Sequence, residues 1–153
     1  MGMHIYDFLP GGWVGARFSR QATLLRSELS RELKDLTVHI LEEDRTLLFR
    51  YLIDCVPTRT LARELGVSSR SVTRRVHVLL TRVRSREYAL VARDSARMGR
   101  LDARIAHAHF CEGYHLRDVA RKLGTSVYRV RLVRARVIAL VNRAAPVKAG
   151  VAA

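Results

Sequence analysis

The fold of this chain is decided by residues 44–86, which read DRTLLFRYLIDCVPTRTLARELGVSSRSVTRRVHVLLTRVRSR. A small residue, Ala62, is followed by Gly66 and then by Ser68 and Ser69. Two helices that cross closely need a small side chain in the first helix, and the turn between them suits glycine, which tolerates a left-handed backbone. A serine after the turn can cap the N–H groups of the second helix. The order of these residues predicts a helix-turn-helix, whose centre is flanked by the apolar Leu61, Leu65 and Val67.

The second helix of this pair is expected over residues 69–84. An apolar stripe at steps of four, three and four predicts its buried face: Val72, Val76, Leu79 and Val83. Arginines and hydroxyl groups on the other face suit base edges and phosphates, although a merely solvated face has the same composition. The residues expected to contact DNA here are Ser69, Arg70, Ser71, Thr73, Arg74, Arg75 (at the edge of the stripe) and His77. Arg82 and Arg84 come later, where we expect them to meet only the DNA backbone or solvent.

Composition points to a polyanionic partner. The 153 residues carry 28 basic and 14 acidic side chains, a net charge of +14 and a pI near 11.2. Nucleic acid is the commonest partner for such a chain, and an anionic membrane surface is a weaker alternative. Two cysteines form no disulfide framework, and no secretory signal or membrane span is visible, which predicts a cytoplasmic, nucleoid-associated protein without a membrane partner.

Residues 45–84 resemble the promoter-binding region 4 of sigma factors, especially those of the extracytoplasmic-function type. The matching residues are Arg50-Tyr51-Leu52, Ala62, Leu65-Gly66-Val67-Ser68, Val72, Arg75-Val76-His77, Leu80, Arg82 and Arg84. The resemblance implies that residues 69–77 read an upstream promoter element in the major groove. It does not extend to a promoter-melting domain, because the residues before position 44 are too few to form one.

The residues before this stretch fall into two segments. Residues 1–17 are rich in glycine and aromatic side chains, and we expect them to fold over the helices. Residues 18–43 predict a helix with a narrow apolar seam: Ala22, Leu25, Leu29, Leu33, Leu36 and Ile40. The seam can pack on the helix-turn-helix or pair two chains as a homodimer through residues 22–40. Seven of the 14 acidic residues lie between positions 28 and 54, so this helix should face away from DNA and is available to a protein partner.

The first motif recurs further along the chain. Residues 87–100 are expected to form a connecting helix that frays near Gly99. Beyond it, Ala120 and Gly124 repeat Ala62 and Gly66 at a shift of 58 positions, as do Asp102 over Asp44, Arg117 over Arg59, Ser126 over Ser68 and Val130 over Val72. This internal repeat predicts a second helix-turn-helix over residues 101–143, followed by a tail over residues 144–153.

The last helix of the second copy should bury Val130, Val133, Val137 and Leu140. Its exposed face should present Tyr128, Arg129, Arg131, Arg134 and Arg136, of which the first four are expected to contact DNA. The sequence of this copy has diverged further from the sigma-like pattern. A helical bundle without DNA contact therefore remains an alternative for this half.

Little in the sequence indicates catalysis. His107, Cys111 and His115, with His109 between them, match no closed zinc motif, and helix packing is the simpler interpretation. No phosphate-binding loop, nucleophile elbow or clustered carboxylate pair appears. We therefore expect no enzymatic activity, no catalytic residue, no cofactor and no metal.

The sequence as a whole predicts an all-α protein with tandem helix-turn-helix units and an additional N-terminal helix. The expected function is that of a bacterial or phage transcription regulator that binds a specific double-stranded DNA site. Two other functions stay open: an RNA polymerase-binding factor such as an antiterminator or sigma-like modulator, and a non-specific nucleoid or RNA binder.

Overall fold

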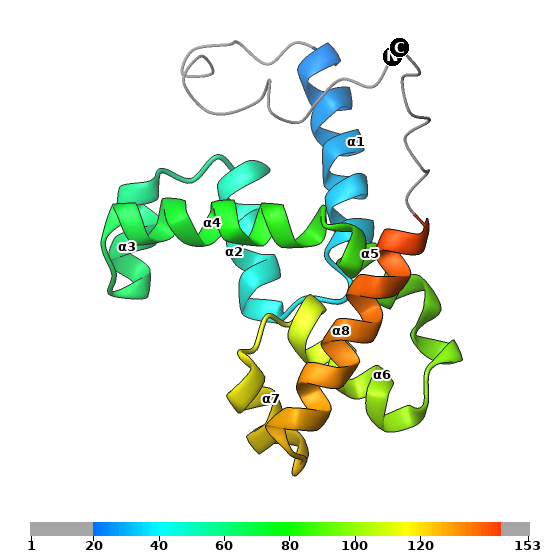
Figure 1. Ribbon diagram of the computed structural model, residues 1–153. Helices are drawn as coiled ribbons and strands as arrows, with labels where there is room; N and C mark the ends of the chain where they lie inside the picture. The colour runs from blue at the N-terminus through cyan, green and yellow to red at the C-terminus, as the bar shows by residue number, and fades with distance from the viewer. Residues whose placement is uncertain (1–19, 145–153) are drawn as a thin grey trace, which may run out of the picture.

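The computed structural model describes residues 20–144, with side chains from residue 27 onward, and over this range the chain is all-α (Figure 1). The predictions for residues 1–17 and 145–153 lie outside the described residues. Eight α-helices follow one another within the described part: α1 (Arg20–Leu36), α2 (Glu42–Leu52), α3 (Thr58–Leu65), α4 (Ser69–Val83), α5 (Arg86–Asp94), α6 (Arg100–Ala106), α7 (Leu116–Leu123) and α8 (Val127–Ala144). A 3-10 turn, η2 (Ser95–Arg97), precedes α6, and a π-helical turn, η3 (His107–Cys111), continues it.

Helices α2, α3 and α4 form a first unit around the predicted motif. Gly66 ends α3 in the left-handed conformation, with φ of +65°, and the Ser68 side chain accepts a hydrogen bond from the Ser71 N–H to cap α4. The predicted stripe of α4 is buried, as are Leu61 and Ala62 of α3. Leu65 and Val67 are about half exposed instead, at 47% each. They lie at the end of α3 and in the turn, where the chain leaves the contact between the two helices.

A second unit repeats this arrangement with the predicted shift. Helix α7 has the bounds of α3 displaced by 58 positions at both ends, and α8 begins 58 positions after α4. Gly124 has φ of +61°, close to that of its counterpart Gly66, and the Ser126 hydroxyl accepts from the Arg129 N–H as Ser68 does from Ser71. The internal repeat of the sequence is therefore a repeat of backbone geometry.

The repeat extends to the turn that precedes each helix pair. The Val56 N–H donates to the Arg50 carbonyl at 2.9 Å, and at the equivalent positions the Tyr114 N–H donates to the Ala108 carbonyl at 3.0 Å. Each turn contains one residue with positive φ, Cys55 (+52°) in the first copy and Gly113 (+82°) in the second. The left-handed conformation suits glycine better than cysteine, yet Cys55 adopts it as well. The shape of this turn therefore does not depend on a glycine at that position.

Helix α5 is more than the predicted connection over residues 87–100. It ends at Asp94 rather than near Gly99, and its buried Tyr88 and Val91 pack within the second unit, where α5 contacts η3 and α8. Because α5 covers this side of α8, the buried stripe of α8 continues through Val141 rather than through the predicted Leu140, which is 44% exposed.

The end of α1 is tied to α5. The helix ends at Leu36 rather than at the predicted residue 43, so Leu33 of the predicted seam is buried in α1 and Ile40 in the turn after it. The fully buried Thr37 donates its hydroxyl to the Leu33 carbonyl at 2.5 Å. The Tyr88 hydroxyl donates to the Leu36 carbonyl at 2.6 Å. The second half of the seam is therefore used within the chain. No helix in residues 20–144 has the length and apolar character needed to cross a membrane.

Candidate nucleic-acid interface

The outward face of α4 presents two arginines for an external partner. Arg70 and Arg74 are exposed, and within the described part of the chain neither forms an ion pair. The hydroxyl groups beside them are engaged locally, since Thr73 Oγ1 donates to the Ser69 carbonyl at 3.1 Å and Ser71 Oγ lies 2.8 Å from Ser68 Oγ. The hydrogen-bond donors that this face offers to a ligand therefore come chiefly from Arg70 and Arg74. Of the other predicted residues, His77 is exposed and Ser69 is partly buried.

Arg75, predicted to contact DNA, is directed toward α2 instead. Its Nε and Nη2 lie 2.9 and 2.7 Å from Oδ1 of Asp44, whose side chain is only 8% exposed. A second carboxylate is close, since Glu43 Oε2 lies 4.0 Å from Arg75 Nη2. A buried carboxylate needs such a partner, and the pair braces α4 against α2. Sequence periodicity placed Arg75 at the edge of the stripe but could not show which acid it meets.

The second unit has an equivalent brace built from different arginines. Asp102, which repeats Asp44, accepts from Arg129 Nε and Nη2 at 3.0 and 2.6 Å and from Arg136 Nη1 at 3.1 Å. Arg75 has no counterpart in this copy, because the equivalent position is Val133. Of the α8 residues predicted to contact DNA, Arg131, Arg134 and Tyr128 stay directed outward, the last 76% exposed.

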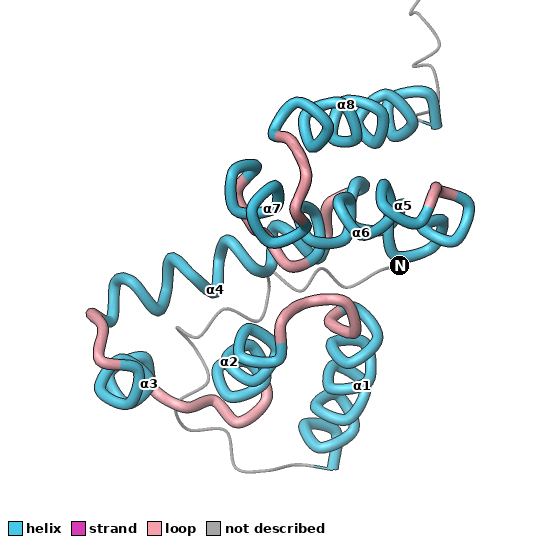
Figure 2. Tube along the Cα trace, turned by 90° about the horizontal axis from the view of Figure 1, so that it is seen from below, coloured by secondary structure: helices cyan, strands magenta, loops and turns pink. Residues whose placement is uncertain are grey.

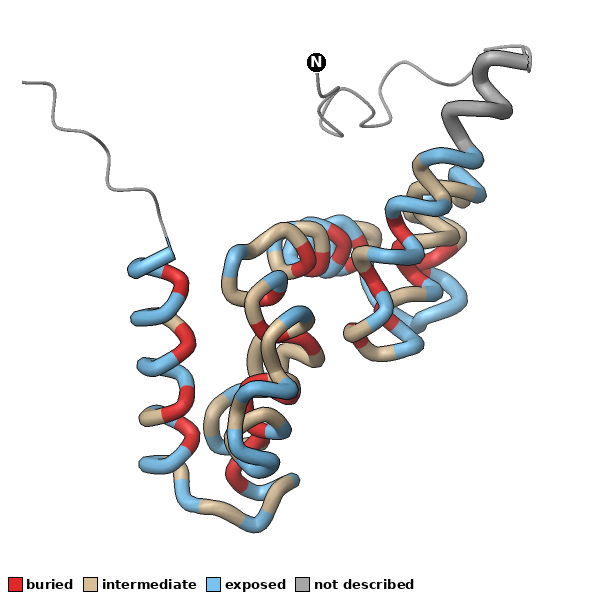
Figure 3. Tube along the Cα trace, turned by 90° about the vertical axis from the view of Figure 1, so that its right-hand side faces the viewer, coloured by how far each residue is buried: buried red, intermediate tan, exposed pale blue. Residues whose placement is uncertain are grey.

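Charge is distributed unevenly over the helices. Helix α4 carries four arginines, α8 carries five, and neither contains an acidic residue. In Figure 3, α8 shows its buried residues along one edge and its exposed residues along the other. The acidic Glu28, Glu32 and Asp35 are exposed on α1. Within the described chain, α4 and α8 are thus the α-helices that combine several arginines with no acidic residue.

The two glycine turns lie at separate ends of the molecule. Figures 1 and 2 both place the α3–α4 turn away from the α7–α8 turn, and α5 and α6 lie with α7 and α8 in the second unit. Outward arginines on two separated helices can donate to phosphate oxygens and to guanine edges. No family model, curated protein or solved structure matches this chain.

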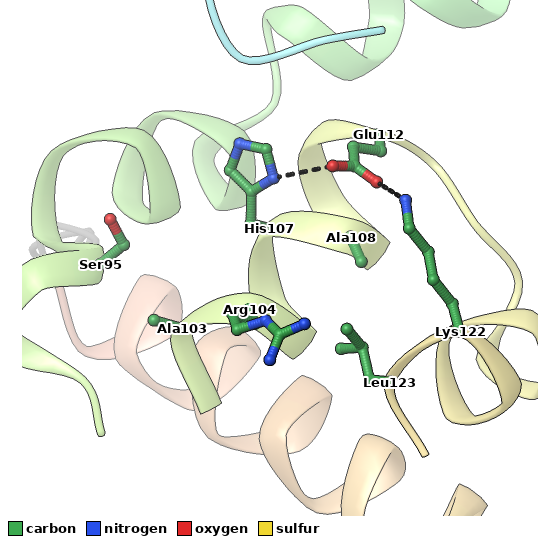
Figure 4. A pocket seen from close by; sticks show the side chains of 8 residues that line it. All are labelled: Ser95, Ala103, Arg104, His107, Ala108, Glu112, Lys122 and Leu123. Carbon is green, nitrogen blue, oxygen red and sulfur yellow. Dashed lines mark hydrogen bonds and ion pairs between the residues drawn. The ribbon is translucent and has the colours of Figure 1, made fainter. Parts of the chain in front are cut away.

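A pocket beside η3 contains charged groups that pair with one another (Figure 4). Glu112 accepts from Lys122 Nζ at 2.7 Å and lies 3.3 Å from His107 Nδ1. Lys122 also lies over the Tyr114 ring, 4.2 Å from its centre. The Glu112 carboxylate therefore already has two partners, whereas Arg104, which also lines the pocket, is exposed and pairs with none of the residues drawn.

The histidines and the cysteine near this pocket are packed into the second unit. His109 Nδ1 donates to the Tyr114 carbonyl at 2.9 Å, and burial lowers the pKa of its ring. Cys111 is fully buried, and burial raises the pKa of its thiol to about 12. His115 is exposed at the start of α7. Among the described side chains, no three histidine, cysteine, aspartate or glutamate residues are grouped to hold a metal ion.

Arg82 lies where the sequence did not predict it. Rather than meeting solvent at the end of α4, its side chain is 21% exposed and reaches the second unit. Its Nη1 donates to the Glu112 carbonyl at 3.3 Å and lies 3.9 Å from Asp44 Oδ2. Four of the exposed-face arginines expected from the sequence keep an outward position, Arg70, Arg74, Arg131 and Arg134, whereas Arg75, Arg82, Arg129 and Arg136 contact carboxylates or carbonyls of the protein.

Proposed function

We propose that this protein is a transcription regulator that binds a specific double-stranded DNA site with two tandem helix-turn-helix units. One observation carries the proposal: the same glycine turn and serine cap occur twice, each time before a helix with outward arginines and no acidic residue. In helix-turn-helix proteins the second helix lies in the major groove and its first turns contact base edges. Helices α4 and α8 have the local geometry and the charge for this role.

In the first unit, Arg70 and Arg74 are the residues proposed to read bases. Both lie in the first two turns of α4, and a guanidinium can donate two hydrogen bonds to one guanine. The Asp44–Arg75 brace and the Ser68 cap hold the start of α4 in place, so that little side-chain or backbone order has to be gained on binding. In this proposal Arg75 positions α4, whereas Arg70 and Arg74 contact the bases.

The second unit should recognise a different half-site. Its outward residues are Tyr128, Arg131 and Arg134, whereas Arg129 and Arg136 are held by Asp102. Tyr128 lies two positions after the cap residue Ser126 and offers an aromatic ring where α4 has Arg70. Two unlike recognition surfaces in one chain favour an asymmetric DNA site over a palindrome.

A protein partner such as RNA polymerase is the second candidate. The observation in its favour is the mixed charge of α1, whose exposed side chains include Glu28, Glu32 and Asp35 beside Arg31 and Lys34. Such a surface is less favourable for DNA than α4 or α8, and it can pair with charged groups of a protein partner. The two functions are compatible, because α1 and the basic helices are different elements.

The proposal is tested by selecting binding sites for the full chain from random duplex DNA at moderate salt. We expect a defined asymmetric sequence to be enriched and to bind at least about 1,000-fold more tightly than a scrambled duplex, the usual range for specific binders. Uniform coating without enrichment favours the non-specific binder. Co-purification with polymerase and no DNA binding favours the second candidate.

A further inference from the structure

Arg82 contacts the second unit at Gly113, and its guanidinium fills the space beside this glycine. A Cβ atom added to Gly113 would lie 2.2 Å from Arg82 Cζ, inside any permitted contact distance. The guanidinium therefore occupies the place that a side chain at position 113 would take, and it also donates to the neighbouring Glu112 carbonyl at 3.3 Å. This contact joins α4, the basic helix of the first unit, to the turn that precedes α7 in the second.

Both partners of this contact depart from the internal repeat. The position equivalent to Arg82 in the second copy is Leu140, which is 44% exposed, and the position equivalent to Gly113 in the first copy is Cys55. The backbone at positions 55 and 113 is nonetheless of the same left-handed kind. Glycine at position 113 suits the left-handed backbone and also leaves space for the arginine that lies against it. The Arg82–Gly113 joint therefore takes one partner from each copy.

Arg82 is also connected to the brace of the first unit. Its Nη1 lies 3.9 Å from Oδ2 of Asp44, while Oδ1 of the same carboxylate accepts from Arg75. One buried carboxylate therefore fixes α4 against α2 and helps to hold the side chain that reaches the second unit. Asp44 therefore helps to orient α4 both within its own unit and relative to the second unit.

We propose that Arg82 is a positioning residue that fixes the first unit relative to the second and so sets the spacing at which both units contact one DNA molecule. This inference rests on the proposed function for its DNA part, whereas the joint itself is testable without DNA. A fixed angle between α4 and α8 allows both to enter grooves only when the half-sites lie on matching faces of the duplex. A loosened joint leaves each unit competent but removes the preference for one spacing.

The joint is tested first by thermal unfolding of the full chain. Gly113→Ala and Gly124→Ala both place alanine in a left-handed turn, but around Gly124 an added Cβ meets no atom within 4 Å. Gly113→Ala should therefore lower Tm by about 2–4 °C more than Gly124→Ala, because it also displaces Arg82. In an Arg82→Ala background this excess effect of Gly113→Ala should largely disappear. An unchanged difference in that background overturns the joint.

The spacing is tested with duplexes that carry both selected half-sites, either at the selected separation or with about five base pairs, half a turn, added between them. Wild type should prefer the selected spacing by at least about ten-fold, and Arg82→Ala should retain less than about three-fold preference while binding a single half-site normally. The control Arg86→Ala removes an exposed arginine of α5 and should behave as wild type.

Each result has a separate meaning. An Arg82→Ala protein that keeps the wild-type preference, or a wild type without any preference, overturns the positioning role. If neither protein distinguishes any selected duplex from scrambled DNA, the proposed function fails, and the unfolding experiment alone decides whether Arg82 and Gly113 join the two units.

Discussion

Replacing Asp44 with asparagine should destabilise the first unit by removing the charge that holds Arg75. Asp44 is 8% exposed at its side chain, and its Oδ1 accepts two hydrogen bonds from Arg75 at 2.7 and 2.9 Å. Hydrogen bonds to charged groups contribute roughly 1.5–3 kcal/mol. Because the Arg75 side chain is 45% exposed and can be rehydrated, and because asparagine keeps one acceptor, the loss should lie around the lower end of this range. We expect a loss of about 1–2 kcal/mol.

The loss is measured by urea unfolding of the full chain near neutral pH, followed by far-ultraviolet circular dichroism. Asp54→Asn is the matched control, since Asp54 lies in the same unit and is exposed. Asp102→Asn should resemble Asp44→Asn, because Asp102 holds Arg129 and Arg136 in the second unit. If Asp44→Asn unfolds within about 0.5 kcal/mol of the Asp54→Asn control, the typical scatter for surface substitutions, the brace does not stabilise the fold.

Further predictions concern the turn, salt and pH. Gly66→Val should lower the free energy of unfolding by about 1–3 kcal/mol through backbone strain at φ of +65°. The control Gly99→Val, at φ of −58°, should cost less. Equal urea midpoints for the two variants would refute the left-handed turn at Gly66. If about five to eight phosphates are neutralised, the log–log salt slope of DNA affinity should be about −4 to −7, and a slope shallower than about −2 would place the basic helices off the backbone. Burial raises the pKa of Cys111 and of Tyr88 to about 12, so the unfolded chain loses these protons first and stability should fall as pH rises above about 9, by up to about 1.4 kcal/mol per pH unit for each group. Cys111→Ala should remove the part of this fall that begins near pH 9; the same alkaline profile in that variant would contradict the assignment.

Local features of the fold could be predicted from the sequence because they depend on local chemistry. The left-handed turn at Gly66 and the cap at Ser68 follow from residue type, and the buried stripe of α4 follows from helical period. The second unit could be predicted because a shift of 58 positions preserves Ala120, Gly124 and Ser126. Each of these features is determined within a few residues along the chain.

Features that depend on distant neighbours could not be predicted in this way. After Val137, a step of three or of four residues keeps the apolar stripe in phase, and only the position of α5 selects Val141 over Leu140. Arg75 and Arg82 look like further basic residues of one helix face, but their carboxylate and carbonyl partners lie 30 or more positions away. The signal for Arg82 was present as a break in the repeat, which has meaning only once Gly113 is placed beside it.

The affinity of single-arginine variants for the selected site and for scrambled DNA, at one salt concentration, tests the central claim most directly. Arg70→Ala and Arg74→Ala should each weaken binding to the selected site by about 1–3 kcal/mol, roughly 5- to 150-fold, and lower the ratio of specific to non-specific affinity. Arg97→Ala, which removes an exposed arginine of η2, should leave that ratio unchanged. Equal losses on both duplexes for all three variants would contradict the account, because they would show that α4 contributes charge without reading sequence.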